Sequence, residues 1–431
     1  MRSLPPQVPR RARCIVIAAA ILLGLAAALL AQEKEYFVSG KKVSEPVYRA
    51  ARLTNDALPL IEAGRLDNAK DALLEALRLA PDFYLARYNL AVLYTRLGED
   101  DAAVAELTKL VSARPEMPEA WVTLAGIYCN RGKYDEALSL LDEAVRAFPA
   151  ADWRNVQQYS YNRGLALTRT GRSAEAIEQF KAALASEPER EQIWLNLAVL
   201  YQETGNLDES IAHYKQFLQR ASQDADSSVV ADALKNLERE YRLVKSRPAS
   251  EANGQDYYFL ASQGRARNWP KQAMPLRVYI HDGEGQQGFQ PRYIDILKSA
   301  FDEWSAASQG RVKFRFTNRL ADAHIECLWS SDPKQLKSIS EGGETRLFYR
   351  ENGGIYDAQI VILTVPVSRL AGVTDRSIRF IALHEIGHAL GILGHSNDPR
   401  DVMYFAIPVA ETDRELSARD KKTLLRFYGQ K

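Results

Sequence analysis

Five glycines recur at nearly constant spacing in the first half of the chain. Successive glycines are 34, 34, 39 and 34 residues apart, at Gly64, Gly98, Gly132, Gly171 and Gly205. Prolines follow in the same phase, at Pro81, Pro115, Pro149 and Pro188. A unit of this length holds two short amphipathic helices, with glycine at the turn between them and proline stopping the second helix. Residues 50–222 are therefore expected to form stacked helix pairs.

Small residues between the glycines support this prediction. They recur in both halves of the unit, at Ala69, Ala103, Ala137 and Ala176 and then at Ala76, Ala144 and Ala183. The pattern resembles the tetratricopeptide repeat, with five repeats over residues 50–222. Apolar residues at helical spacing predict one more amphipathic helix over residues 227–245, which caps the solenoid. The resemblance implies an all-α solenoid whose concave face binds an extended peptide or a partner protein. Candidate peptide contacts on the first helix of the unit are Asn89, Asn162 and Asn196.

A different pattern lies near the C-terminus, where residues 384–395 read H-E-I-G-H-A-L-G-I-L-G-H. Residues four apart on an α-helix lie on one face with Cβ atoms about 5–6 Å apart, so His384 and His388 can bind one metal ion. Gly391 tolerates the positive φ that ends a helix, which lets the chain turn back and present His395. The spacing predicts one Zn²⁺ held by three imidazoles.

Three protein ligands leave the fourth position of a zinc ion open, as in catalytic zinc sites. Water at such a position has its pKa lowered to roughly 7. Glu385 is expected beside this water rather than on the metal. As a general base it can take the proton of the water and pass it to the leaving amine. The motif therefore predicts metal-assisted amide hydrolysis.

The motif and the residues after it resemble the metzincin metalloproteases. Residues 401–404 read D-V-M-Y, which looks like the methionine turn of that group, and Ser396 after the third histidine resembles its matrixin branch. The resemblance implies that Met403 lies beneath the zinc site as a structural residue. It also implies a substrate cleft that crosses the site.

The residues before the motif extend this resemblance to a whole domain over residues 269–431. Strands are expected over residues 276–281, 312–316, 324–329 and 355–363, and helices over residues 291–307 and 417–428. The predicted chain is thus multidomain, an all-α solenoid followed by an α+β metzincin-like catalytic domain, with a linker over residues 246–268.

The same resemblance implies how a substrate binds. In the family a peptide pairs in extended form with the edge strand that precedes the zinc helix. Here that role falls to the segment Gln359, Ile360, Val361 and Ile362. Residues 405–408 depart from the family pattern, so no preference for a substrate side chain is carried over.

Two further histidines in this domain have two interpretations. His281 and His324 could bind a second, structural metal together with Asp282 or Asp322. The favoured alternative is that each is a partly exposed histidine near a strand end.

An apolar segment precedes the repeats. Arg10, Arg11 and Arg13 stand before the uncharged residues 14–31, a pattern typical of an export signal or a membrane anchor. Eighteen helical residues span about 27 Å, close to the hydrocarbon thickness of a bilayer, so a cleaved signal and an uncleaved anchor both stay open. In both cases the positive flank predicts that the rest of the chain is periplasmic, at the cell surface or secreted.

Composition adds little. A formal net charge of +1 gives no indication of a nucleic-acid partner. The isolated positions Cys14, Cys129 and Cys327 predict neither a disulfide framework nor a metal site.

These patterns predict an exported zinc endopeptidase that acts on a protein or peptide and recruits a protein through its repeats. The alternative is an envelope scaffold in which the repeats bind a partner while the peptidase-like domain is inactive. Three histidines, Glu385 and Met403 are all present, which favours the enzyme. Zinc content combined with turnover separates the two hypotheses.

Overall fold

A computed structural model of the chain describes residues 36–156, 158–221, 225–246, 254–263, 266–336, 342–366, 373–405 and 414–429. It divides into two compact units, Met1–Arg114 and Pro115–Lys431. The expected signal or anchor over residues 1–31 lies outside the described residues. None of the described helices has both the length and the apolar character needed to cross a bilayer.

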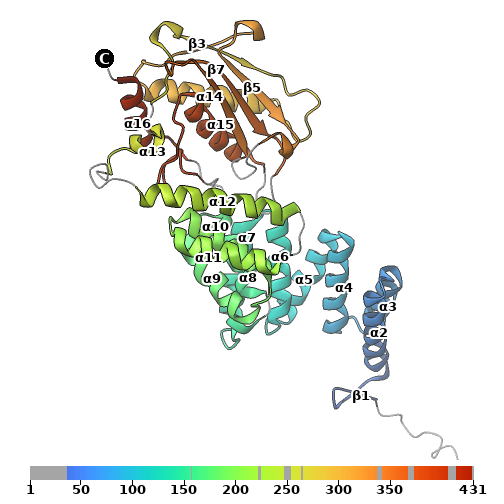
Figure 1. Cartoon of the computed structure of the whole chain (residues 1–431). Coiled ribbons are helices and arrows are strands. Elements are labelled where there is room, and N and C mark those ends of the chain that lie inside the picture. Colours follow the sequence, from blue (N-terminus) through green and yellow to red (C-terminus); the bar gives the residue numbers. More distant parts are fainter. Residues whose placement is uncertain are drawn as a thin grey trace, which may run out of the picture. The chain divides into compact units, whose positions relative to one another are not determined.

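The first unit consists of a small hairpin and two helix pairs (Figure 1). Its elements are β1 (Tyr36–Val38), β2 (Lys41–Val43), α2 (Glu45–Glu62), α3 (Leu66–Leu79), α4 (Tyr84–Leu97) and α5 (Asp100–Ala113). Gly64 and Gly98 stand at the turn inside each pair with φ of +71° and +74°, a conformation that favours glycine. Ala69 and Ala76 are fully buried between the helices, as their recurrence predicts.

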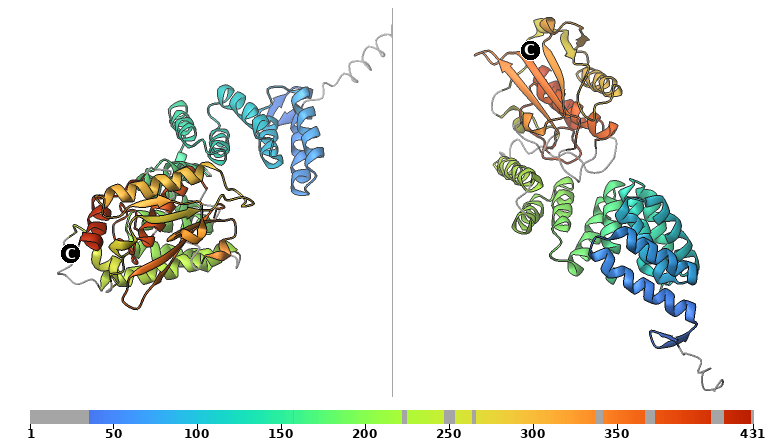
Figure 2. Two further views of the ribbon diagram at one scale, coloured as in Figure 1. Left: turned by 90° about the horizontal axis from the view of Figure 1, so that it is seen from above. Right: turned by 90° about the vertical axis from the view of Figure 1, so that its right-hand side faces the viewer.

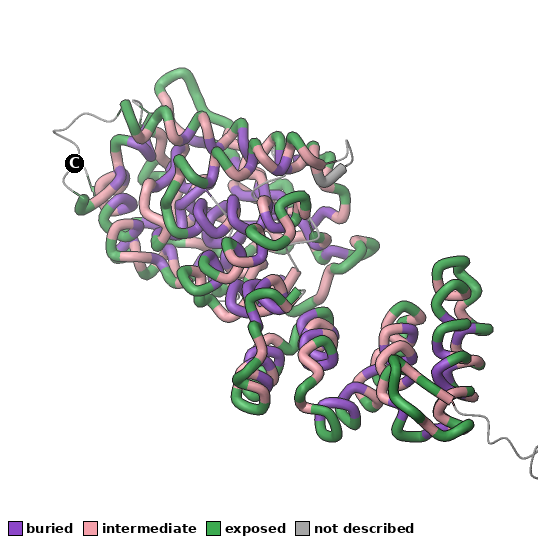
Figure 3. The backbone as a smooth tube through the Cα atoms, turned by 90° about the horizontal axis from the view of Figure 1, so that it is seen from below, coloured by how far each residue is buried: buried purple, intermediate pink, exposed green. Residues whose placement is uncertain are grey.

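The second unit begins with three more helix pairs and a single helix. These are α6 (Pro118–Asn130), α7 (Tyr134–Ala147), α8 (Tyr159–Arg169), α9 (Ser173–Ser186), α10 (Glu191–Glu203), α11 (Leu207–Arg220) and α12 (Ala225–Lys245). The paired helices run antiparallel (Figure 2), and the buried positions of a helix gather on the side that faces its neighbours (Figure 3). The described residues thus contain the five predicted pairs, and α12 agrees with the predicted capping helix.

A five-stranded sheet with helices on one face forms the rest of the second unit (Figure 1). The strand order is β4-β3-β5-β7-β6, from β3 (Leu276–Ile280), β4 (Phe314–Phe316), β5 (Ile325–Ser330), β6 (Gly343–Tyr349) and β7 (Ile355–Leu363). Only β6 is antiparallel to its neighbour. The helices are α13 (Tyr258–Ser262), α14 (Arg292–Ala307), α15 (Asp375–Ala389) and α16 (Ala418–Gly429).

The predicted edge strand is wrong. Gln359, Ile360, Val361 and Ile362 lie in β7, which pairs with β5 on one side and with β6 on the other. Ile360 and Ile362 are fully buried, as expected for a near-continuous apolar run in a central strand. The edge strand next to the zinc helix is β6, which the sequence analysis did not identify.

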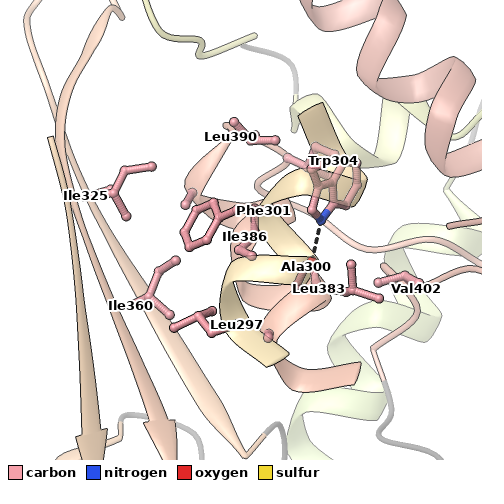
Figure 4. Close-up of a cluster of buried hydrophobic side chains, with 14 of the residues drawn as sticks. Leu297, Ala300, Phe301, Trp304, Ile325, Ile360, Leu383, Ile386, Leu390 and Val402 are labelled. Carbon is pink, nitrogen blue, oxygen red and sulfur yellow. Dashed lines mark hydrogen bonds between the residues drawn. The ribbon is translucent and has the colours of Figure 1, made fainter. Parts of the chain in front are cut away.

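The core of this domain joins the sheet to both large helices (Figure 4). Phe301 of α14 and Ile386 of α15 pack against Ile325 and Ile360 of the sheet. Trp304 of α14 is fully buried, and its indole Nε1 donates a hydrogen bond of 2.8 Å to the carbonyl of Leu383. The zinc helix α15 is therefore fixed by a polar contact as well as by apolar packing.

The predicted linker over residues 246–268 is wrong in its second half. Tyr257, Leu260 and Ala261 belong to the same buried cluster as Trp269. The hydroxyl of Tyr257 donates to Asp420 in α16 at 2.5 Å. A helix as short as α13 shows no periodicity, so composition alone assigned these residues to a linker.

We expect Trp304→Phe to lower the free energy of unfolding by about 2 kcal/mol, because it removes a buried hydrogen bond and part of a close-packed ring. Trp194→Phe is the control, since that ring is only partly buried and its indole donates an exposed hydrogen bond to the carbonyl of Pro188. It should cost less than about 1 kcal/mol, the usual net worth of one hydrogen bond. Urea unfolding of both variants tests this, and equal losses would contradict the role given to Trp304.

Candidate metal centre

Two of the three motif histidines stand on the last turns of α15. The helix begins with a capping box, in which Thr374 Oγ1 accepts from the amide of Ser377 and Ser377 Oγ accepts from the amide of Thr374. This reciprocal cap satisfies two of the amides that a helix start leaves without partners. His384 and His388 lie one turn apart at the other end of the helix.

Glycine allows the chain to turn back after α15. Gly391 has φ of +93°, and a Cβ atom there would lie 1.9 Å from the carbonyl oxygen of Arg267. A Cβ atom at Gly394 would lie 2.1 Å from the carbonyl oxygen of Leu260. The backbone before the sheet therefore packs directly against this turn, and the turn brings His395 to the other two histidines.

The three imidazoles converge. One ligand atom from each of His384, His388 and His395 lies within 4.8 Å of the others. The Nε2 atoms of His384 and His388 are 3.1 Å apart, and the ring centroids of the three pairs lie 4.7, 5.3 and 5.1 Å apart. This is the one such group of metal-ligating side chains among the described residues.

Backbone carbonyls orient two of these rings. His384 Nδ1 lies 2.9 Å from the carbonyl oxygen of Val402, and His388 Nδ1 lies 2.5 Å from that of Ile392. A carbonyl only accepts, so Nδ1 carries the proton and the Nε2 lone pair faces the centre. Burial lowers the pKa of His384 to about 3 and the pKa of His388 well below its usual range. Both rings are therefore neutral, the form that binds a metal ion.

Glu385 is fully buried beside the histidines. Thr345 of β6 donates through Oγ1 to Glu385 Oε2 at 2.7 Å and to the Glu385 carbonyl at 2.9 Å. A Cβ atom at Gly343 of the same strand would lie 2.7 Å from Glu385 Cγ and 2.9 Å from Oε1. The edge strand thus leaves room for the carboxylate and fixes its orientation. Neither β6 residue could be identified from the sequence, because this strand shows no apolar alternation.

Met403 is fully buried under α15, where the resemblance places it. A Cβ atom at Gly387 would lie 2.3 Å from Met403 Sδ and 3.1 Å from Trp304. The turn that carries Met403 is held by a bond of 2.7 Å from the Ser396 amide to the Met403 carbonyl. Asp420 of α16 accepts from the Val402 amide at 3.0 Å.

A cleft of about 420 Å³ opens over the site. It is lined by Glu385, His388 and His395, by Leu393, by Gly343, Glu344, Thr345, Leu347 and Tyr349 of β6, and by Asn236 and Arg239 of α12. The predicted substrate segment Gln359–Ile362 does not line it. The capping helix α12 thus forms part of the wall of the cleft, which no sequence pattern predicted.

The other histidines of the domain have protein partners. His281 Nε2 lies 2.8 Å from Glu326 Oε1, and His324 Nε2 lies 2.8 Å from Arg277 Nη2. Both histidines are partly exposed and adjoin the end of a strand, as the favoured alternative predicts. Among the candidate peptide contacts, Asn162 is buried and donates to the carbonyl of Val122, so its amide is used inside the fold.

Family comparisons match both halves of the chain. The tetratricopeptide repeat matches residues 57–118, 116–186 and 161–225, and the matrixin family matches residues 284–429. The chain carries tetratricopeptide repeats followed by a matrixin domain, which confirms both predicted resemblances. The alignment of a metalloprotease family with the domain that holds the three histidines places this centre in the metalloprotease class.

Individual relatives are similar to parts of the chain. Human protein O-mannosyl-transferase TMTC1 is 24% identical over 208 residues, 48% of this chain and 23% of that protein. Metalloendoproteinase 1 of Glycine max is 29% identical over 151 residues, 32% of this chain and 48% of that protein. The chain thus spans less than half the length of each. A thermophilic TPR protein of Thermus thermophilus, of known structure, is 29% identical with a TM-score of 0.34, covering 43% of this chain and 99% of that one.

The matrixin family implies zinc, and the residues present fit it. Three imidazoles face one point, and the two with carbonyl partners are in the neutral, metal-binding tautomer. Nitrogen ligands of this number suit a zinc site that keeps one position for water or substrate.

We expect the full chain to bind one zinc ion and His395→Ala to weaken that binding more than the roughly 100-fold that loss of an outer hydrogen-bond partner costs. His213→Ala is the control, because His213 lies in α11 and is not part of the group. Competition with a chromophoric chelator measures both affinities. Unchanged affinity in His395→Ala would remove this residue from the site.

Proposed function

We propose that this protein is a zinc-dependent endopeptidase. The observation that carries the proposal is the Glu385 carboxylate, which is buried and oriented by Thr345 in the cleft that His388 and His395 also line. A carboxylate is not buried beside metal-binding histidines without cost, since its desolvation must be offset by hydrogen bonds or charge. That arrangement suits a general base, because the carboxylate must be directed at the attacking water to accept its proton.

The residues divide the chemistry between them. A zinc ion held by His384, His388 and His395 would polarise the substrate carbonyl and acidify a water molecule. Glu385 takes the proton from the attacking water and returns it to the nitrogen of the leaving amine. Thr345 keeps the carboxylate aligned for both transfers through its bond to Oε2. Alignment of this kind lowers the barrier because the reacting groups are already in place.

The edge strand β6 is the proposed binding site for the peptide. Within the described sheet it pairs with β7 only, so its other side offers backbone groups to an extended chain. Thr345, Leu347 and Tyr349 of this strand line the cleft. The substrate therefore runs along β6 and brings its scissile bond to Glu385.

Export and recruitment complete the proposal. The arginines and the apolar residues 14–31 support export, and the repeats support binding of a protein partner. The substrate class is accordingly a protein or peptide outside the cytoplasm.

The deciding experiment compares casein cleavage by the full-length wild type and Glu385→Gln, with bound zinc quantified in both. We expect one zinc in each protein and a loss of turnover of about 10²–10⁴-fold in the variant, because the proton acceptor is gone while the imidazoles remain. A chelator should stop the wild type. Zinc without cleavage in the wild type would favour the inactive scaffold.

Gly343→Ala tests how the base is held. The new Cβ atom would collide with Glu385 Cγ, so we expect turnover to fall about 100-fold, as a misplacement of about 1 Å does, with zinc retained. Gly354→Ala, just before β7, is the control, because its nearest neighbour is a side-chain oxygen of Asn352 at 3.3 Å. Full activity in Gly343→Ala would show that Glu385 does not need this position.

A further inference from the structure

Helix α12, which caps the repeats, reaches the metal centre. Asn236 and Arg239 line the cleft, and the next residue, Glu240, approaches the third histidine. Glu240 Oε1 lies 3.5 Å from His395 Nδ1, and the side chains of both residues are only 6% exposed. A helix from the repeat region therefore supplies a carboxylate to the one motif histidine that follows the turn.

This carboxylate is built into its position. Arg239 approaches Glu240 Oε1 through Nε at 3.3 Å and through Nη2 at 3.1 Å. The same oxygen thus faces a guanidinium on one side and the imidazole of His395 on the other. A buried carboxylate needs such partners, because an unpaired buried charge is strongly destabilising. The Arg239 side chain is 57% exposed, so the buried partner of Glu240 is His395.

The surroundings fix α12 relative to the centre. Tyr404 and Phe405, which follow Met403, form one buried cluster with residues of α10, α11 and α12. The members from these helices are Leu195, Ala198, Tyr214, Phe217, Val230, Leu234 and Leu237. Tyr404 also donates to the carbonyl of Gln202 in α10 at 2.7 Å. The last repeat and α12 therefore hold the methionine turn while Glu240 meets the ring of His395.

We propose that Glu240 is a positioning residue for the third metal ligand. His384 and His388 are oriented by carbonyl oxygens at Nδ1, and Glu240 places a charged oxygen 3.5 Å from the corresponding Nδ1 of His395. A partner at Nδ1 sets the tautomer and the ring plane, so that Nε2 faces the metal. Because the partner is a carboxylate, it also makes the imidazole a stronger donor. The inference rests on the proposed zinc site and makes α12 a component of it.

The test measures zinc affinity of the full chain by chelator competition and the absorption spectrum of the cobalt-substituted protein. Glu240→Ala removes the partner of His395, and we expect zinc binding to weaken by about 10–100-fold. Glu240→Gln keeps volume and an acceptor oxygen, so it should lose less. The cobalt spectrum should change in both, because Ala removes the acceptor beside the third ring and Gln removes its negative charge.

Glu238→Gln is the matched control, since Glu238 lies on α12 but pairs with Lys215 at 2.9 Å. It should bind zinc like the wild type. If Glu240→Ala fails to fold, the isosteric Glu240→Gln decides alone. Zinc affinity within about twofold of the wild type and an unchanged cobalt spectrum in Glu240→Gln, and in Glu240→Ala where it folds, would overturn the proposal, since loss of such a partner should cost at least about tenfold. A wild type that binds zinc but cleaves nothing refutes the peptidase and leaves this comparison valid.

Discussion

The direct packing of backbone on backbone at Gly391 and Gly394 is the contact on which the rest of the domain depends. The amides of Leu393 and Gly394 both donate to the carbonyl of Ala261, at 2.9 and 3.0 Å. No side chain fits between these segments, because a Cβ atom at either glycine would overlap a carbonyl oxygen. The contact ends the zinc helix, reverses the chain and carries His395 back to the helix. It also explains why the residues just before the sheet belong to the catalytic domain.

A second close approach, between Gly387 of α15 and Met403, fixes the zinc helix against the methionine turn. Gly387 lets α15 rest on Met403, while the indole of Trp304 closes the other side and bonds to Leu383. The methionine turn in turn delivers the Val402 carbonyl to His384. One glycine thus links the packing of the core to the tautomer of a metal ligand. The helical spacing that places His384 and His388 on one face also places Gly387 against the turn that carries Met403.

The features that local spacing determines could be predicted from the sequence. Helix pairs follow from glycines 34 residues apart, and the triad follows from positions 384, 388 and 395. The edge strand of the sheet could not be predicted from the sequence, because strand order depends on pairing between distant segments. The apolar strand Ile355–Leu363 gives a strong signal and is central, whereas Gly343–Tyr349 gives a weak one and forms the edge. Gly343 and Thr345, which hold Glu385, lie on that strand, so their role could not be predicted either. Amphipathic periodicity identified α12 as a helix but not that Glu240 would meet His395.

In the proposed arrangement, the position of α12 makes metal binding and the docking of the last repeat thermodynamically dependent on each other. If Glu240 holds His395, a dication on the three imidazoles lowers the electrostatic cost of burying the Glu240 carboxylate. Metal binding then stabilises the docked helix, and by reciprocity the docked helix strengthens metal binding. The apolar cluster of Tyr404 and Phe405 with α10, α11 and α12 couples the same helix to the methionine turn. A protein that binds the last repeat and shifts α12 would act on the third ligand directly, without needing to reach the cleft.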